Sequence, residues 1–219
     1  MSIAPDGSPV DLYLLLPPRG EADVVHAAIP AGAQILELGC GVGRVTHELL
    51  RLGHPVVAVD ESEEMLAHVR GAATVHARIE ELDLGRRFAC VLLMSNLVNA
   101  EEECEAFLGA CARHVARDGV VLIERHDPQW EPEVGKRGSL GDVASELEDV
   151  RREGRVVAAT ARYESGDRVW RHPFRARLLD DDELDADLRA VGLELVRSFG
   201  ERGEWVEARL IPRRSSTPR

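Results

Sequence analysis

The sequence predicts a doubly wound α/β fold, on the evidence of three features in its first 125 residues. Short apolar runs recur at 33–38, 55–59, 74–77, 88–93 and 119–123, with helical patterns between them. A glycine-rich turn follows the first run, and an acid closes the second. Strands that are apolar throughout are typical of a parallel sheet covered by helices on both faces. Because ligands of such folds bind at the carboxyl ends of the strands, we expect the functional site there.

The helical segments have recognisable ends. The first, at 10–16, stops at Pro17 and Pro18, and Pro30 and Gly32 break the second, at 21–28. A helical pattern follows the glycine-rich turn until Gly53, and another covers 101–116. Ser62 is expected to cap the helix that carries Met65, because its hydroxyl can accept a backbone N–H.

After residue 124 the pattern changes. A loop rich in proline, glycine and charge (127–141) leads into extended segments at 143–150, 156–163 and 168–178, joined by short turns. This predicts an inserted antiparallel β-meander. A helix at 180–191 and a hairpin within 193–211 follow. We expect a single domain over 1–219, with an N-terminal helical lid (1–30), a cofactor-binding core (31–125), the meander (142–178) and a closing helix and hairpin (180–211).

Composition excludes several classes of protein. Asp and Glu outnumber Lys and Arg by 39 to 27, which gives a formal charge of −12. This balance disfavours nucleic acid as a partner, because a polyanion binder needs a concentrated basic surface. No apolar run approaches the ~20 residues that span a bilayer, so we expect no membrane partner and a cytoplasmic location. The spacing of the four cysteines does not suggest zinc, and we expect no metal.

The glycine-rich turn is the most informative segment. Gly39, Gly41 and Gly43 follow a strand and precede a helix, which brings backbone N–H groups close to a ligand. A dinucleotide-binding loop has the spacing G-x-G-x-x-G, but here the third glycine comes one residue early. Glu37 would also repel a pyrophosphate and favour an ammonium or sulfonium group. These features disfavour an oxidoreductase that uses NAD.

Asp60 ends the second strand, 21 residues after Gly39. A carboxylate at this place can accept hydrogen bonds from both hydroxyls of a ribose. The alternative is that Asp60 only caps the next helix, but Ser62 is better suited to that role.

The segment E-L-G-C-G-V-G, followed by V-D-E-S-E-E-M-L, resembles the class I S-adenosylmethionine-dependent methyltransferases. The resemblance spans about 30–125 and the closing hairpin. It implies a Rossmann-like seven-stranded sheet with an antiparallel last strand, and S-adenosylmethionine as the cofactor. It also implies cofactor-binding roles, which we assign to Glu37, Gly39, Cys40, Gly41, Gly43, Asp60, Glu61, Met65, Ile79, Glu80 and Ser95. Arg78 stands where related enzymes usually have an acid, and Glu80 is the substitute that we consider for it.

The acceptor side follows from the later strands. By the carboxyl-end rule, the segment 94–99 borders the methyl group; it lacks the N/D-P-P-Y/F tetrapeptide of enzymes that methylate DNA and protein amino groups. His126, after the fifth strand, is the candidate general base, because an imidazole titrates near 6.5; the alternative is a surface histidine that donates to a loop carbonyl. The candidate substrate residues are Tyr13, Asn96, Asn99, Trp170 and His172.

The aromatic face of Trp170, His172 and Phe174 has three interpretations: a wall of the acceptor pocket, a homodimer contact, or packing on the last helix. On the first, Trp170→Ala raises the acceptor KM and leaves the cofactor Kd within about twofold. The sequence thus predicts transfer of a methyl group from S-adenosylmethionine to an oxygen or nitrogen of a small molecule. The alternative is a non-catalytic regulatory protein that binds S-adenosylmethionine on the same fold.

Overall fold

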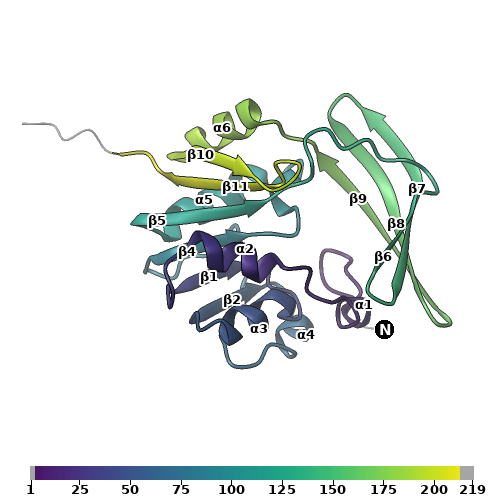
Figure 1. The fold of residues 1–219 in the computed structure, drawn as a ribbon, viewed down its shortest axis with the longest axis horizontal. Coiled ribbons are helices and arrows are strands. Elements are labelled where there is room, and N and C mark those ends of the chain that lie inside the picture. Colours follow the sequence, from purple (N-terminus) through teal and green to yellow (C-terminus); the bar gives the residue numbers. More distant parts are fainter. Residues whose placement is uncertain (1–2, 213–219) are drawn as a thin grey trace, which may run out of the picture.

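The computed structural model describes residues 3–212 and contains two sheets that stand side by side (Figure 1). The expected limits of the single domain, 1 and 219, lie outside the described residues. The larger sheet has seven strands in the order β10-β11-β5-β4-β1-β2-β3, and the smaller has four in the order β6-β7-β8-β9. The sequence predicted both sheets, although it predicted only three strands for the smaller one.

The central strands of the larger sheet are β1 (Ile35–Leu38), β2 (Val56–Asp60), β3 (Ala73–His76), β4 (Phe88–Leu93) and β5 (Val115–Glu124), and they run parallel. The last strand, β11 (Trp205–Leu210), pairs antiparallel with β5 and with β10 (Leu193–Phe199). The expected antiparallel last strand is therefore confirmed.

Helices cover both faces of this sheet and form two apolar cores. On one face, α5 (Cys104–His114) and α6 (Asp181–Ala190) pack over side chains that include Leu36 and Leu38. On the other, α2 (Glu21–Ala28) and α3 (Arg44–Arg51) pack over side chains that include Ile35. Successive residues of a strand point to opposite faces, so an all-apolar strand serves both cores. This explains why the apolar runs predicted the strands well.

Three helices are shorter than the sequence predicted. The first, α1, covers Val10–Tyr13 and ends before Pro17, and α5 begins at Cys104 and ends at His114. The helix that carries Met65, α4, is a single turn over Glu63–Leu66. The expected cap of α4 is confirmed, because the Ser62 hydroxyl accepts a hydrogen bond from the Met65 amide at 3.2 Å. A further 3₁₀ turn, η1 (Leu97–Asn99), follows β4.

The smaller sheet contains β6 (Arg137–Leu140), β7 (Val143–Glu153), β8 (Val156–Ser165) and β9 (Arg168–Arg177), all antiparallel. The sequence predicted a loop over β6, and this was wrong. Residues 137–139 are exposed, so β6 is held by backbone pairing with β7 and has no apolar pattern to reveal it. A bulge interrupts β7 at Asp149, whose φ is 55°.

Candidate functional site

The glycine-rich turn joins β1 to α3 at the carboxyl ends of the parallel strands. Gly39, Gly41 and Gly43 have φ values of 71°, 55° and 83°, which residues that carry a Cβ rarely adopt. The amides of Gly39 and Cys40 both donate to the Val59 carbonyl at 2.9 Å. The turn is therefore fixed to the end of β2, next to Asp60.

Asp60 is bound to the turn through its carboxylate. The Gly41 amide donates to Oδ2 at 2.7 Å, and the Ser62 amide donates to Oδ1 at 2.9 Å. Each oxygen keeps lone-pair capacity for a ligand, because a carboxylate accepts at about four positions. Burial, the largest influence, raises the pKa of Asp60. The structure thus places the predicted acid and the predicted turn in direct contact.

Open space lies over the middle of the turn. A Cβ added at Gly41 would have no neighbour within 4 Å, whereas one at Gly39 would lie 2.6 Å from Leu97 Cδ1 and 3.8 Å from Ile79 Cδ1. Leu97 therefore closes one side of the turn together with the predicted Ile79. The sequence placed the segment 94–99 near the methyl group but did not single out Leu97, because no local pattern indicates that η1 folds back to Gly39.

Glu37 lies beneath the turn and is 2% exposed. The Thr46 hydroxyl donates to its Oε2 at 2.6 Å. Burial raises the pKa of Glu37 to about 7, because charge is disfavoured away from water. Burial also raises the pKa of the Cys40 thiol, so Cys40 is neutral at physiological pH. A cationic ligand near Glu37 would favour its ionised form.

The N-terminal segment packs against this site. Ala4 and Val10 form an apolar cluster with Val42 of the turn and Met65 of α4, and Tyr13 packs against the cluster. Burial raises the pKa of Tyr13, whose hydroxyl oxygen accepts a hydrogen bond from Ser8 at 3.4 Å. Tyr13 and Met65 therefore lie at the same site, although the sequence assigned one to the acceptor and the other to the cofactor.

Residues after β3 form an exposed charge cluster. Arg78 Nη2 lies 2.7 Å from Glu80 Oε1, and Arg78 Nε lies 4.0 Å from Glu61 Oε2. Arg78 is exposed, while Ile79 is 8% exposed and belongs to the core. The arginine therefore pairs with Glu61 and Glu80, two of the four acids that the sequence assigned to the cofactor.

The end of β4 has a strained backbone. Ser95 and Asn96 have φ values of 56° and 60°, a left-handed conformation that is uncommon without glycine and frequent at functional sites. The Ser95 amide donates to Glu124 Oε2 at 2.8 Å, which holds the turn against the end of β5. Sequence reasoning did not identify Glu124 as part of the site.

Glu124 belongs to a wider charge network at the base of the N-terminal segment. Arg19 Nη2 donates to Glu124 at 3.3 Å, and Arg19 Nε donates to Glu21 at 3.2 Å. Arg44, the residue after Gly43, donates to the same Glu21 oxygen at 2.6 Å. The Arg19–Glu124 and Arg44–Glu21 contacts join sequence-distant segments, so no local pattern could have revealed them.

His126 lies in an aromatic stack. Its ring centroid is 4.7 Å from Trp130 and 6.4 Å from Phe174 of β9. Burial lowers its pKa to about 4, far below the ordinary value assumed from the sequence. Its backbone amide donates to Asn99 Oδ1 at 2.9 Å, and Asn99 Nδ2 donates to the Arg177 carbonyl at 2.8 Å. Asn99 therefore ties the ends of β5 and β9 together.

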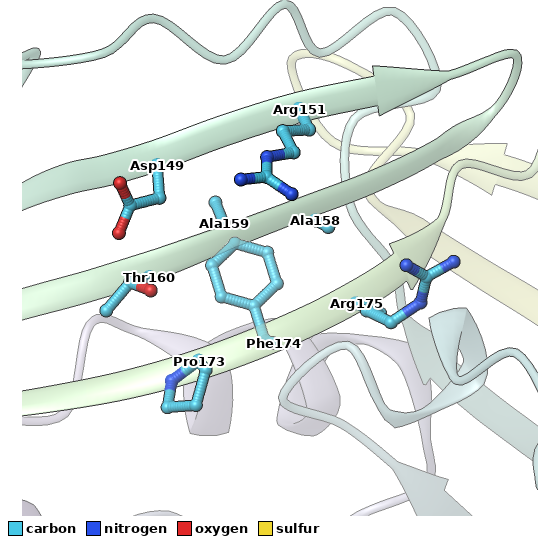
Figure 2. Close-up of a pocket in the computed structure, with 8 residues that line it drawn as sticks. All are labelled: Asp149, Arg151, Ala158, Ala159, Thr160, Pro173, Phe174 and Arg175. Carbon is cyan, nitrogen blue, oxygen red and sulfur yellow. The ribbon is translucent and has the colours of Figure 1, made fainter.

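The aromatic residues of β9 have different surroundings. Trp170 is 2% exposed and packs with Leu12 and Val143, so α1 covers it rather than the last helix. His172 Nδ1 is buried and has no hydrogen-bond partner among the residues described. Phe174 lines an open groove of about 520 Å³ on the smaller sheet (Figure 2). Phe174 is thus shared by the groove and the His126 stack.

Within residues 3–212, no helix has the length and apolar character needed to cross a bilayer. Over the same residues, no group of three or more His, Cys, Asp or Glu side chains is placed to hold a metal ion.

Comparisons with known proteins place these features in context. Residues 35–119 match a family model described as a methyltransferase domain. A ubiquinone biosynthesis O-methyltransferase from Bradyrhizobium sp. (strain ORS 278) is 33% identical over 112 residues, which are 46% of this chain and 42% of that protein. The chain thus matches less than half the length of this curated relative.

Solved structures match over a longer span. The CcbJ methyltransferase from Streptomyces caelestis has a TM-score of 0.75 at 23% identity, covering 93% of this chain and 96% of that one. CalS10, an amino pentose methyltransferase from Micromonospora echinaspora with S-adenosylmethionine bound, has a TM-score of 0.65 at 25% identity, covering 86% and 87%. The likeness to CcbJ therefore extends beyond the glycine-rich core.

Proposed function

Because the chain belongs to the class I S-adenosylmethionine-dependent methyltransferases, we propose that it transfers a methyl group from this cofactor to an oxygen or nitrogen of a small-molecule acceptor. The observation that carries the proposal is the contact between Gly41 and Asp60 beneath open space. When bound, the cofactor supplies a methyl group activated by a sulfonium. The protein has to align the acceptor, exclude water and, for some acceptors, take up a proton.

The residues around the turn fit this cofactor. Open space at Gly41 leaves room for a ligand that a Cβ would obstruct, and the Asp60 carboxylate can accept hydrogen bonds from ribose hydroxyls. Buried Glu37 favours a cationic group nearby, as the methionine part of the cofactor provides. The N-terminal segment adds an apolar cover through Val10 and Tyr13. These features support the cofactor-binding roles that the sequence analysis assigned.

We place the acceptor between the carboxyl ends of β4 and β5 and the smaller sheet. His126, Trp130 and Phe174 offer a flat aromatic surface there, and the unpartnered His172 Nδ1 offers a polar contact. Such a combination suits a small, partly apolar molecule. With a pKa of about 4, His126 is neutral at physiological pH and can accept a proton only weakly.

Methyl incorporation tests the proposal. The protein is incubated with S-adenosylmethionine labelled in the methyl group and a panel of small molecules that carry amino or hydroxyl groups. Labelled product with at least one acceptor is expected. The non-catalytic alternative predicts cofactor binding without incorporation for the whole panel. The cytoplasmic location, the homodimer and the absence of a nucleic-acid partner stay predictions.

A further inference from the structure

One helix joins the two halves of the molecule. α1 lies between the larger and the smaller sheet (Figure 1), although it contains only four residues. Val10 and Tyr13 face the glycine-rich turn, whereas Leu12 packs with Trp170 and Val143 of the smaller sheet. Both sides of this helix are therefore occupied, one by the cofactor site and one by the inserted sheet.

Polar contacts fix α1 to β9. The Trp170 indole N–H donates to Asp11 Oδ1 at 3.1 Å, and the same carboxylate forms an ion pair with Arg168. The Arg168 guanidinium also lies over the Trp170 ring, 4.7 Å from its centroid. A buried indole N–H needs a partner, so this hydrogen bond makes the position of α1 specific.

The segment after α1 is fixed to the core and to the inserted sheet. The Pro17 carbonyl accepts a hydrogen bond from Arg44 at 3.2 Å. A Cβ added at Gly141, just before β7, would lie 3.0 Å from Pro17 Cγ. Arg44, which follows the glycine-rich turn, thus holds the segment after α1, while β9 holds α1 itself through Trp170 and Arg168.

We propose that Trp170 and Asp11 are positioning residues for the cofactor: the inserted sheet holds α1, and through it Val10 and Tyr13, over the glycine-rich turn. The inference rests on the cofactor part of the proposed function. It replaces the sequence expectation that Trp170 acts on the acceptor alone. Cofactor affinity then depends on a residue of the inserted sheet that belongs to neither the turn nor the strands beside it.

Two variants separate the hydrogen bond from the packing. Trp170→Phe keeps an aromatic ring but removes the N–H, and Asp11→Ala removes the acceptor. We expect each to weaken S-adenosylmethionine binding by three- to tenfold in calorimetry. Asp11→Asn keeps an acceptor oxygen for the indole and loses the charge that faces Arg168, so it should restore part of the affinity. Because both substitutions remove the same hydrogen bond, their effects should not add. The S-adenosylmethionine Kd of the double variant Asp11→Ala/Trp170→Phe should be at most twice that of the single variant with the larger Kd.

Hydrogen exchange provides a readout that needs no cofactor. Amides of residues 12–16 should exchange faster in Trp170→Phe and Asp11→Ala than in the wild type, while those of β1 stay unchanged. Arg171→Gln is the matched control, because Arg171 is the next residue of β9, is exposed and pairs with Glu148 at 2.9 Å. It should alter neither exchange at α1 nor cofactor affinity.

Two results would overturn the inference. One is unchanged exchange at α1 in both variants, and the other is faster exchange with a cofactor Kd within 1.5-fold of the wild type. A wild-type protein that binds no S-adenosylmethionine would instead overturn the proposed function, together with the cofactor half of this inference.

Discussion

The core around β1 and the inserted sheet are built in different ways. Every residue of β1 is buried, and both of its faces pack against apolar clusters. β9 instead has only two buried residues, Trp170 and Ala176, and several arginines of its sheet pair with acids of the rest of the protein. Arg175 pairs with Glu101 at 2.5 Å, and Arg155 with Glu183 at 2.6 Å. Such exposed pairs are worth about 0–1 kcal/mol each. The core is therefore held by continuous apolar packing, whereas the inserted sheet is attached by exposed ion pairs and by the small buried cluster around Trp170.

The difference has a functional consequence. We assign cofactor recognition to the core and acceptor recognition to the inserted sheet, with α1 between them. The largest expected effect concerns the turn. Gly41→Val introduces a branched side chain at a φ of 55° and into the open space above the turn. We expect cofactor affinity to fall more than 100-fold in calorimetry.

A matched control separates the two effects of Gly41→Val, which are the filling of the ligand space and the backbone strain. Gly53 has a φ of 88° and no neighbour within 4 Å of an added Cβ, but it lies between α3 and β2, at the opposite end of the strands. Gly53→Val should therefore lose a similar free energy of unfolding, about 1–3 kcal/mol, and bind the cofactor normally. Equal cofactor affinity in the two variants would contradict our placement of the ligand.

Asp60→Ala comes next in size. It removes an acceptor of two backbone amides and of the expected ribose hydroxyls, and hydrogen bonds to charged groups are worth about 1.5–3 kcal/mol. We expect cofactor affinity to fall by about 10- to 150-fold. Asp83→Ala removes an exposed carboxylate that also accepts a nearby backbone amide, and it should have no such effect. A folded Asp60→Ala variant with unchanged affinity would remove Asp60 from the site.

These two predictions rest on residues that the sequence identified, and the reason is local. Gly39, Gly41 and Asp60 lie at fixed offsets from apolar strands, so strand periodicity places them at one edge. Glu124, Arg19 and Leu97 reach the site through contacts between distant segments, which no short pattern encodes. The strand β6 escaped prediction for a related reason, since backbone pairing forms it rather than an apolar face.

His126 lies where the core meets the inserted sheet, and its lowered pKa predicts how stability depends on pH. Its folded pKa of about 4 lies below the unfolded value near 6.5, so the unfolded chain binds more protons between these pH values. The free energy of unfolding should therefore fall as pH drops from 6.5 to 4, by about 2–3 kcal/mol in chemical denaturation. His126→Phe keeps a ring against Trp130 and should lack this dependence. A pH dependence that persists in His126→Phe would assign it to another group.

The same pKa predicts the pH dependence of the rate. Because the imidazole stays neutral above pH 5, kcat should be flat from pH 5 to 8, whereas a base with the ordinary imidazole pKa would lose activity below pH 6.5. His126→Ala should lower kcat about 10- to 100-fold, below the larger values typical of a well-matched base. A kcat near that of the wild type would leave alignment of the acceptor as the main catalytic contribution.

The smallest expected effect concerns the inserted sheet. Phe174→Ala removes one ring of the stack with His126 and Trp130. An aromatic pair is worth about 0.5–1.5 kcal/mol, so the acceptor KM should rise about 2- to 12-fold. The cofactor Kd should stay within twofold, because Phe174 has no contact with α1 comparable to that of Trp170. A change in cofactor Kd with a constant acceptor KM would mean that Phe174 contributes to the cofactor site and not to the acceptor site.

Calorimetric titration of the wild-type protein with S-adenosylmethionine and, separately, with NAD tests the central claim most directly. The claim is that the turn at Gly39–Gly43 and Asp60 form a site for a cationic nucleoside cofactor. We expect saturable binding of S-adenosylmethionine at one site per chain and no measurable binding of NAD. Saturable binding of NAD, with none of S-adenosylmethionine, would contradict it.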